Sequence, residues 1–407
     1  MTDIDRMLQP DEARDIVLAH TKPLGSERVP LLEAGGRVLG ERLIATQSLP
    51  PFRAATMDGF AVVAGDTSRE RRIIAGGLAG SVPDQPVEPG VAARIMTGAP
   101  VPEGADAVVP IENTEISGDV VTIVKPPAAP GENIRPIGSD MLEGDVLIEA
   151  GTRLGPAEIG LLASLGHAEV TVGKRPRAAV FSTGDEIVDP SETPGPGQIR
   201  DSNRFTLTYA AQLAGAEVIL TRRIPDSSDE LRAAFQEALD KADVIITSGG
   251  VSMGDRDLVK ALLGEFASVH FRRVFMKPGK PLNFATAGDK LVFGLPGNPV
   301  SCLVSFHMFA VPALNVMQGA PAGKHAVTPV AVEHAIHPSD RIEYQRARVV
   351  AGPDGRLLAR TTGPQQSARL MSFVGANAFL VVPPGDAEIP AGSILDAILF
   401  AAPVAAD

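Results

Sequence analysis

Three loops rich in glycine and proline, all between residues 247 and 301, constrain the fold of this chain more than any other feature. They begin at Thr247, Lys277 and Gly294 and read TSGG, KPGKP and GLPGNP. Short apolar runs, such as residues 244–246, precede them. Glycine lets main-chain N–H groups approach an oxygen atom closely, so such loops suit a phosphorylated anion. The stretch therefore predicts an anion-binding edge on a sheet.

Apolar runs alternate with amphipathic stretches between residues 177 and 319, and this pattern predicts the fold around the loops. Strands are expected at 178–181, 217–220, 244–247 and 269–274, and helices at 202–214, 229–240, from 255 and after 299. Ser227 and Glu230 have the spacing of a capping box at the start of one helix. A βαβ series of this kind predicts a doubly wound, mainly parallel sheet, which binds ligands beyond the carboxyl ends of its strands.

The remaining chain is predicted to form three further parts, so the protein is a multidomain α/β protein. Short β-branched runs between Gly and Pro turns indicate an inserted β-rich module at 46–140, in which Asp58-Gly59 is typical of a hairpin turn. Because helices are expected on both sides of it, at 10–20 and 155–165, residues 1–45 and 141–175 are predicted to form one composite linking domain. The α/β domain takes residues 176–325, and later short strands predict a C-terminal β barrel at 326–407.

Composition narrows the classes of function. A net charge of −12 argues against a general nucleic-acid binder, whose phosphate contacts need a basic face. Cys302 is the single cysteine, so no intrachain disulfide is possible, and we expect a buried core thiol in preference to a nucleophile. The acidic start lacks the features of a signal peptide, and we expect no apolar segment that approaches the length of a membrane span. A cytoplasmic protein follows.

Two of the predicted strand ends carry polar loops that belong at the same sheet edge. Their hydroxyl and N–H groups, together with two nearby lysines, can donate hydrogen bonds to a phosphate. A carboxylate at the same edge can bind Mg²⁺, which takes carboxylates together with substrate phosphates. Either glycine loop taken alone is equally consistent with an ordinary turn between a strand and a helix. The residues concerned are Thr183, Gly184, Glu186, Ser248, Gly249, Gly250, Lys277 and Lys280.

Two further carboxylates have simple structural interpretations. Asp226 follows a proline just before a predicted helix, where it could serve as a cap. Asp257 falls in the first turn of a predicted helix, where the helix dipole favours a negative charge. From the residues alone, both are interpreted as structural.

Additional motifs point to one family. Residues 247–255, 277–281 and 294–301 carry its most specific marks, and Met57-Asp58-Gly59, Met96-Thr97-Gly98-Ala99 and the run QSARLMS at 366–372 accompany them. With these, nearly the whole chain closely resembles the molybdopterin molybdenumtransferase family, which includes MoeA-type bacterial enzymes and the E domain of gephyrin. The first motif is shared with MogA-type adenylyltransferases and CinA-like proteins, so alone it indicates only the molybdopterin-binding fold. Ala55-Thr56 depart from the Ser-Ala pair that is usual in the family.

The resemblance implies the insertion of molybdate into adenylated molybdopterin, with Mg²⁺ as cofactor and release of AMP. It also implies a homodimer whose active site is shared between subunits, and transient contact with other proteins of molybdenum-cofactor biosynthesis. Nucleic acid and membrane are not expected partners. Two other hypotheses are a MogA-type adenylyltransferase that uses ATP, which does not require the flanking β domains, and a scaffold that only binds molybdopterin, as gephyrin does in a separate role.

The resemblance also assigns roles to individual residues. Those that match the reaction positions of the family are Asp58, Thr97, Asp140, Glu186, Asp226 and Asp257, of which Glu186, Asp226 and Asp257 would hold Mg²⁺. The substrate-binding positions are Arg135, Thr183, Gly184, Ser248, Gly249, Gly250, Ser252, Pro296, Pro299 and Ser301. The set that would hold molybdate is Lys277, Lys280, Arg346 and Ser367, whose donors suit a tetrahedral oxyanion.

Overall fold

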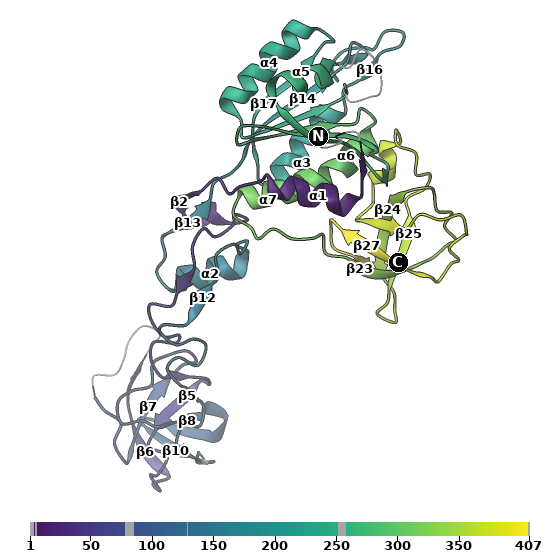
Figure 1. The fold of residues 1–407 in the computed structure, drawn as a ribbon. Helices are drawn as coiled ribbons and strands as arrows, with labels where there is room; N and C mark the ends of the chain where they lie inside the picture. Colours follow the sequence, from purple (N-terminus) through teal and green to yellow (C-terminus); the bar gives the residue numbers. More distant parts are fainter. Residues whose placement is uncertain (1–3, 5, 78–84, 128, 251–257, 406–407) are drawn as a thin grey trace. The chain divides into compact units, whose positions relative to one another are not determined.

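The computed structural model describes residues 4, 6–77, 85–127, 129–250 and 258–405. The chain divides into two compact units. Unit 1 comprises Met1–Glu41, Ala150–Ile159 and Glu169–Asp407, and unit 2 comprises Arg42–Glu149 and Gly160–Ala168. The four-part division expected from the sequence remains a prediction, and each unit is described by itself (Figure 1).

A seven-stranded sheet forms the centre of unit 1. Its strand order is β1-β19-β21-β22-β18-β14-β17. The four strands β22, β18, β14 and β17 are parallel neighbours, whereas β21 is antiparallel to both strands beside it. The doubly wound, mainly parallel sheet is therefore confirmed, with an added β21–β22 hairpin. The strands are β1 (Met7–Leu8), β14 (Arg177–Thr183), β17 (Glu217–Ile224), β18 (Val244–Ser248), β19 (Ser268–Val274), β21 (Pro281–Ala287) and β22 (Lys290–Leu295).

Helices cover both faces of this sheet because successive residues of a strand point to opposite faces. In β14, Ala178 and Val180 belong to one apolar cluster, and Ala179 and Phe181 belong to another. The first cluster is completed by α1 (Pro10–Ala19), α3 (Asn203–Leu213), α6 (Pro299–Ser305) and α7 (Val311–Met317), and the second by α4 (Ser228–Lys241) and α5 (Leu258–Phe266). Figure 1 shows α4 and α5 on one side of β14 and β17, with α3 and α6 on the other. The strands between these layers are buried on both faces.

The apolar run after Asn298 contains a π-helical turn, Phe306–Ala310, between α6 and α7. Pro312 has no N–H for the carbonyl of Met308 four residues earlier, and His325 Nε2 lies 3.0 Å from that oxygen instead. Within the described residues, Pro299–Met317 is the one helical run long and apolar enough to cross a membrane, with a mean hydropathy of 1.7. The expectation that no segment has this length is therefore wrong. Of the 18-residue window that has this hydropathy, 72% is buried inside the protein.

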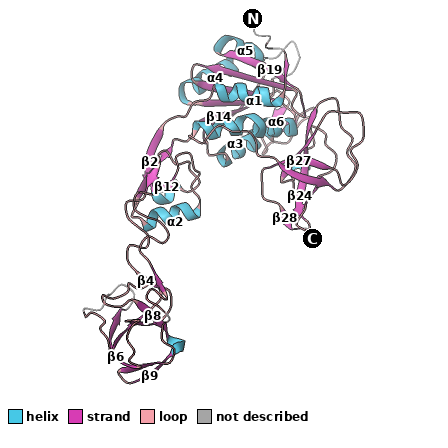
Figure 2. Cartoon of the chain, turned by 60° about the horizontal axis from the view of Figure 1, so that its bottom comes forward, coloured by secondary structure: helices cyan, strands magenta, loops and turns pink. Residues whose placement is uncertain are grey.

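The C-terminal part of unit 1 is a closed barrel of five strands, in agreement with the expectation from the sequence. Its order is β24-β25-β23-β27-β26, and pairing between β24 and β26 closes it. Alternating residues of β26 face two cores, since Ala378 and Leu380 fill the barrel whereas Phe379 packs against the helical layer of the sheet. The strands are β23 (Thr328–Val332), β24 (Ile342–Ala351), β25 (Leu357–Thr361), β26 (Ala378–Val382) and β27 (Ile394–Leu399), and Figure 2 shows β24 and β27 beside β28 (Val404–Ala405).

Short strand pairs complete unit 1. Strand β2 (Ser26–Pro30) pairs with β13 (Glu169–Gly173), and β15 (Ile187–Val188) pairs with β16 (Ile199–Arg200). Strand β20 (Met276–Lys277) extends the barrel by pairing with β24, with Lys277 opposite Glu343. The barrel therefore fixes the backbone of one of the three predicted anion-binding loops.

Unit 2 is built on a six-stranded sheet of order β8-β5-β7-β6-β10-β9, which confirms that this part is rich in β structure. The expected hairpin turn at Asp58-Gly59 is wrong, because Gly59 begins β5 and pairs with both Ile95 and Pro110. A Cβ atom on Gly59 would lie 2.0 Å from the carbonyl oxygen of Val109, so glycine serves close packing here. The strands are β5 (Gly59–Val62), β6 (Glu70–Gly77), β7 (Val91–Ile95), β8 (Ala107–Pro110), β9 (Thr114–Ser117) and β10 (Val120–Ile123).

Shorter elements accompany this sheet. Strand β4 (Ala54–Ala55) pairs with β11 (Ile134–Arg135), and β3 (Leu43–Ile44) pairs with β12 (Val146–Ile148). Helix α2 (Pro156–Ser164) begins in unit 1 and ends in unit 2, within one residue of the expected bounds 155–165, and Gly166 with a φ of 82° follows it.

Candidate functional site

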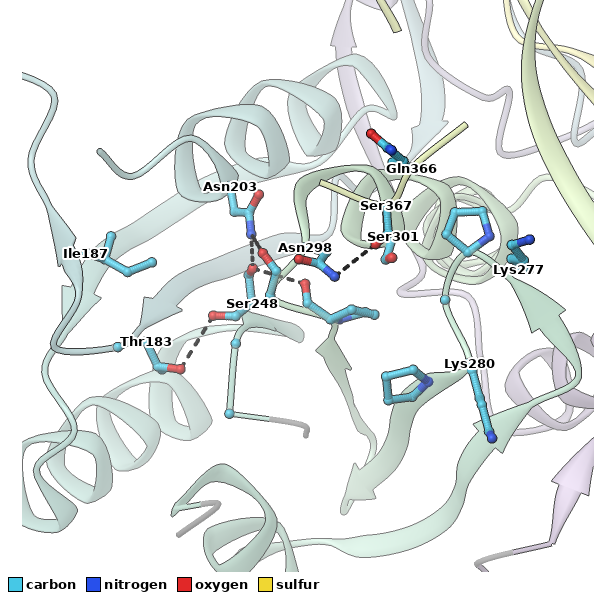
Figure 3. Close-up of a pocket in the computed structure, with 18 of the residues that line it drawn as sticks. Thr183, Ile187, Asn203, Ser248, Lys277, Lys280, Asn298, Ser301, Gln366 and Ser367 are labelled. Atoms are coloured by element: carbon cyan, nitrogen blue, oxygen red, sulfur yellow. Dashed lines mark hydrogen bonds between the residues drawn. The ribbon is translucent and has the colours of Figure 1, made fainter. Parts of the chain in front are cut away.

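A cavity of about 920 Å³ lies in unit 1, where the carboxyl ends of β14, β18 and β22 meet the barrel loop at residues 365–367. Figure 3 shows Thr183 and Ile187 on one side of it, and Lys277, Lys280 and Ser367 on the other. All three glycine- and proline-rich loops contribute to its lining. The predicted residues that line it are Thr183, Gly184, Glu186, Asp226, Ser248, Gly249, Gly250, Lys277, Lys280, Pro296, Ser301 and Ser367.

Glycine is required in the loop after β18 for conformational and steric reasons. Gly249 and Gly250 have φ values of 92° and 66°, which side-chain-bearing residues rarely adopt. A Cβ atom on Gly249 would also lie 2.6 Å from the carbonyl oxygen of Thr183. The loop after β18 thus lies directly against the end of β14, and the expectation that the two loops meet at one sheet edge is confirmed.

A buried asparagine at the start of α3 connects two of these loops. Asn203 Nδ2 donates to Ser248 Oγ at 2.6 Å and to the carbonyl oxygen of Gly297 at 2.7 Å (Figure 3). No sequence pattern indicates this role, because Asn203 is separated from both loops by more than a complete strand and helix. Only the tertiary structure brings Asn203 next to the two loops.

The side of the cavity formed by the loop after β14 carries negative charge. Burial raises the pKa of Asp226, and repulsion from Asp185 and then Glu186 raises it further. The interpretation of Asp226 as a helix cap is wrong, because Ser227 Oγ receives the N–H of Glu230 and serves as the N-cap of α4. The carboxylate of Asp226 is therefore free to line the cavity.

These carboxylates fit a divalent cation only together with ligand oxygens. Over the residues that the structure describes, no three Asp, Glu, His or Cys side chains converge to hold a metal ion. Mg²⁺ commonly takes one or two carboxylates and completes its coordination with phosphate and water. Glu186 and Asp226, which repel each other across this edge, are suited to that arrangement. Ser252 and Asp257, also predicted here, lie outside the described residues.

The opposite side of the cavity carries positive charge. Lys277 Nζ lies 2.7 Å from Glu343 Oε1, and Gln345 Nε2 donates to the other oxygen of that carboxylate. Burial alone would raise the pKa of Glu343, but hydrogen bonds from Lys277, Ser339 and Gln345 hold it below its ordinary value. Lys280 forms no ion pair with any described residue. One lysine is thus held in place by the barrel, and the other is available to an anion.

Ser367 reaches the cavity from the barrel. Its hydroxyl accepts a hydrogen bond from Asn298 Nδ2 at 3.0 Å, and its carbonyl oxygen accepts one from the N–H of Val300 at 3.0 Å. The loop that carries Ser367 is therefore attached to the start of α6. Pro299 begins α6 and does not line the cavity, whereas Pro296 and Ser301 do.

The structure places Arg346 outside the lining of the cavity. Its side chain is fully buried, and Nε donates to Ser372 Oγ at 3.0 Å. Burial lowers the pKa of Arg346 to about 10, and Nη2 has no hydrogen-bond partner among the described residues. The backbone N–H and C=O of Arg346 both bind the amide of Gln365. Arg346 thus holds the loop of Ser367 through Gln365, on the side of the loop away from the cavity.

Four predicted residues lie in unit 2 and do not line this cavity. Asp58 accepts hydrogen bonds from Thr97 N at 2.7 Å and Thr97 Oγ1 at 2.8 Å, and these lower its pKa. Arg135 forms an ion pair with Asp140. Each pair thus joins residues that the sequence singled out separately.

Cys302 is buried, and burial raises the pKa of its thiol to about 12. It is a core residue, as expected.

Family models match nearly all of the chain. Residues 8–166 match the MoeA N-terminal region (domains I and II), residues 179–316 match a probable molybdopterin-binding domain, and residues 332–400 match the MoeA C-terminal region (domain IV).

Named relatives agree with these matches. The chain is 36% identical to the molybdopterin molybdenumtransferases of Haemophilus influenzae, over 95% of this chain and 97% of that protein, and of Bacillus subtilis, over 96% and 93%. It is also 36% identical to gephyrin of Dictyostelium discoideum, over 96% of this chain but only 62% of that protein. Among solved structures, a molybdopterin biosynthesis MoeA protein of Pyrococcus horikoshii matches with a TM-score of 0.79 and 31% identity, over 98% of this chain and 100% of that one. The chain therefore belongs to the molybdopterin molybdenumtransferase family, whose members act in molybdenum-cofactor biosynthesis.

Proposed function

We propose that this protein inserts molybdate into adenylated molybdopterin, with Mg²⁺ as cofactor and release of AMP. The observation that carries the proposal is the division of charge in one cavity. The carboxylates Glu186 and Asp226 line the cavity beside the loop after β14. The donors Lys277, Lys280 and Ser367 lie on the side away from Thr183 and Ile187 (Figure 3). The reaction needs two binding sites, one for the diphosphate of adenylated molybdopterin and one for the molybdate oxyanion. This cavity has a side with carboxylates and a side with lysines.

The edge after β14 and β18 suits the diphosphate. The main-chain N–H of Gly250 is a donor at this edge for which no described residue is an acceptor, and it can serve a phosphate oxygen. The N–H of Gly249 donates to the carbonyl oxygen of Leu295 at 3.2 Å, and the Thr183 hydroxyl lies 3.5 Å from the carbonyl oxygen of Ser248. When bound between Glu186, Asp226 and the phosphate oxygens, Mg²⁺ would neutralise charge that develops as AMP leaves. The repulsion that raises the pKa of Asp226 supports this role, because a cation relieves it.

The opposite side suits molybdate, which is a substrate here. Lys280 has no competing carboxylate among the described residues, and Ser367 adds a neutral donor. Lys277 is held by Glu343 at a fixed position, so its remaining N–H groups have a defined direction. Two ammonium groups and a hydroxyl match an acceptor-only tetrahedral anion.

The test is molybdate-dependent release of AMP from adenylated molybdopterin by the purified protein with Mg²⁺. We expect molybdate to stimulate AMP release and active molybdenum cofactor to form. AMP release that molybdate does not change would contradict the proposal. Consumption of ATP with free molybdopterin would support the adenylyltransferase hypothesis instead, and binding without turnover would support the scaffold.

We also propose that the protein acts as a homodimer in which unit 2 of a second copy completes the site. The residues Asp58, Thr97, Arg135 and Asp140 match reaction positions of the family but do not line the cavity of unit 1. An exposed apolar stripe on α3, at Phe205, Tyr209 and Leu213, is available for a second copy; these residues are 50%, 63% and 71% exposed and lie four apart on one helix face.

Mixing two inactive variants tests this shared site. Asp58→Ala and Lys280→Ala would each be inactive alone, but a mixed dimer keeps one intact site if the site is shared. Random exchange of subunits then restores about a quarter of the wild-type activity. No recovery, in a mixture shown by mass spectrometry to contain mixed dimers, would refute the shared site.

The cellular setting follows from the same proposal. We infer a cytoplasmic enzyme that receives adenylated molybdopterin from another protein of the same biosynthesis and passes on the finished cofactor. Its single cysteine is buried, which is compatible with a reducing compartment.

A further inference from the structure

The contact between Asn298 and Ser367 joins the sheet domain to the barrel at the cavity. Asn298 precedes α6 in the sheet domain, and Ser367 lies on the barrel loop. Asn298 stands at the N-cap position of α6 but makes no side-chain capping bond. Its amide donates to Ser367 Oγ instead, at 3.0 Å (Figure 3). A role other than helix capping therefore explains its orientation.

This hydrogen bond determines what the Ser367 hydroxyl can do. A hydroxyl has one hydrogen and two acceptor positions, and the amide of Asn298 occupies one acceptor position. The hydrogen therefore cannot point towards Asn298, and no described residue accepts it. The hydrogen is therefore left for a ligand in the cavity, or for water when no ligand is bound. The neighbouring Gln365 cannot serve the ligand in the same way, because its amide is bound to Arg346 and Gly363.

We propose that Asn298 is a positioning residue that directs the Ser367 hydroxyl hydrogen to an oxyanion bound between Lys277, Lys280 and Ser367. The proposal rests on the function proposed above and deepens it, because it assigns a task to Asn298, which the sequence analysis left without a role within the GLPGNP loop. An acceptor-only anion such as molybdate gains a hydrogen bond from the arrangement. An aspartate at position 298 would accept the serine hydrogen itself and take that bond away from the anion.

The test measures molybdate binding by calorimetry at pH 8, in the full chain without pterin. Asn298→Asp keeps the shape of the side chain, reverses the hydrogen bond and adds one negative charge. Gln366→Glu is the matched control, since it adds one negative charge at the same side of the cavity without touching Ser367. We expect Asn298→Asp to weaken binding at least about tenfold more than Gln366→Glu does, the effect of one hydrogen bond to a charged group.

A second pair of variants shows whether Asn298 acts through Ser367. In a Ser367→Ala background the serine hydrogen is absent, so Asn298→Asp should weaken binding no more than Gln366→Glu. Equal losses for Asn298→Asp in both backgrounds would overturn the proposal. If wild-type protein does not bind molybdate at all, the oxyanion site proposed above fails and this inference fails with it. Binding that Asn298→Asp leaves intact would overturn this inference alone.

Discussion

His307 should make the core between the helices and the barrel sensitive to acid. It lies in the π-helical turn with its ring 5.6 Å from that of Phe379 and 5.5 Å from that of Phe400. Burial among these rings, and then the nearby His325, lower the pKa of His307 from 6.5 to about 4. The folded protein therefore holds this ring neutral at a pH where an unfolded chain would protonate it.

The direction and size of the effect follow from linkage. Because the folded pKa is below the unfolded pKa, the stability contributed by the neutral ring is complete above pH 6.5 and is lost as the pH falls towards 4. Between pH 7.5 and pH 5.0, the two pKa values give a loss of about 2 kcal/mol in the free energy of unfolding. Replacement by phenylalanine should remove this loss, since the ring keeps its aromatic contacts and cannot be protonated.

Urea unfolding at the two pH values measures the effect. Tyr344 is buried in the same apolar cluster, so its near-ultraviolet circular dichroism reports this core. Wild-type protein should lose about 2 kcal/mol more than His307→Phe on acidification. His337→Gln is the control, because the His337 side chain is 81% exposed, and it should behave as wild type. Equal losses for wild type and His307→Phe would refute the reasoning.

The remaining predictions concern packing and charge. Gly173→Ala should lower the free energy of unfolding by more than about 3 kcal/mol in urea denaturation, because a Cβ atom there would lie 1.7 Å from the carbonyl oxygen of Gln318. Gly160→Ala on α2 is the control, because Gly160 has open space around it, and it should not destabilise the protein. His325→Leu should cost about 1–3 kcal/mol by the same assay, since the Met308 carbonyl loses its partner, and an unchanged midpoint would mean that water replaces the ring. Glu343→Gln should lower the KM for molybdate several-fold, because the amide oxygen still accepts a hydrogen bond from Lys277 while one negative charge leaves the site. A raised KM would show that the charge of Glu343 is needed to hold the lysine. Asp226→Asn should abolish AMP release. It should raise the free energy of unfolding by no more than about 1 kcal/mol, because it relieves repulsion from Asp185 and Glu186, and a fall in that free energy would contradict this account.

Local sequence patterns predicted many elements with good boundaries. Helix α1 begins at Pro10 as expected, and α4 follows a serine cap as its capping box indicates. These predictions succeeded because capping, periodicity and proline geometry act within a few residues. The β21–β22 hairpin was missed because its strands lie among loop-like glycine and proline residues, and only pairing with β18 and β19 defines them.

Long-range contacts explain where the sequence was insufficient. The helix containing Pro299–Met317 is apolar enough for a membrane by composition, and only its burial between sheet and barrel accounts for it here. Arg346 carries the charge expected of an oxyanion ligand, but the fold buries it behind Gln365. The residue type alone does not show whether the Arg346 side chain lines the cavity or is buried behind the loop.

The sequence by itself determined the family, the alternation of strands and helices around the three glycine-rich loops apart from the β21–β22 hairpin, and the donor chemistry of Lys280 and Ser367. Proline restricts the backbone and glycine permits conformations that other residues rarely adopt, so these features follow from local chemistry. The tertiary structure decided which partners constrain that chemistry. Lys277 meets Glu343, Ser248 meets Asn203 and Ser367 meets Asn298 only because distant strands and loops converge at one sheet edge.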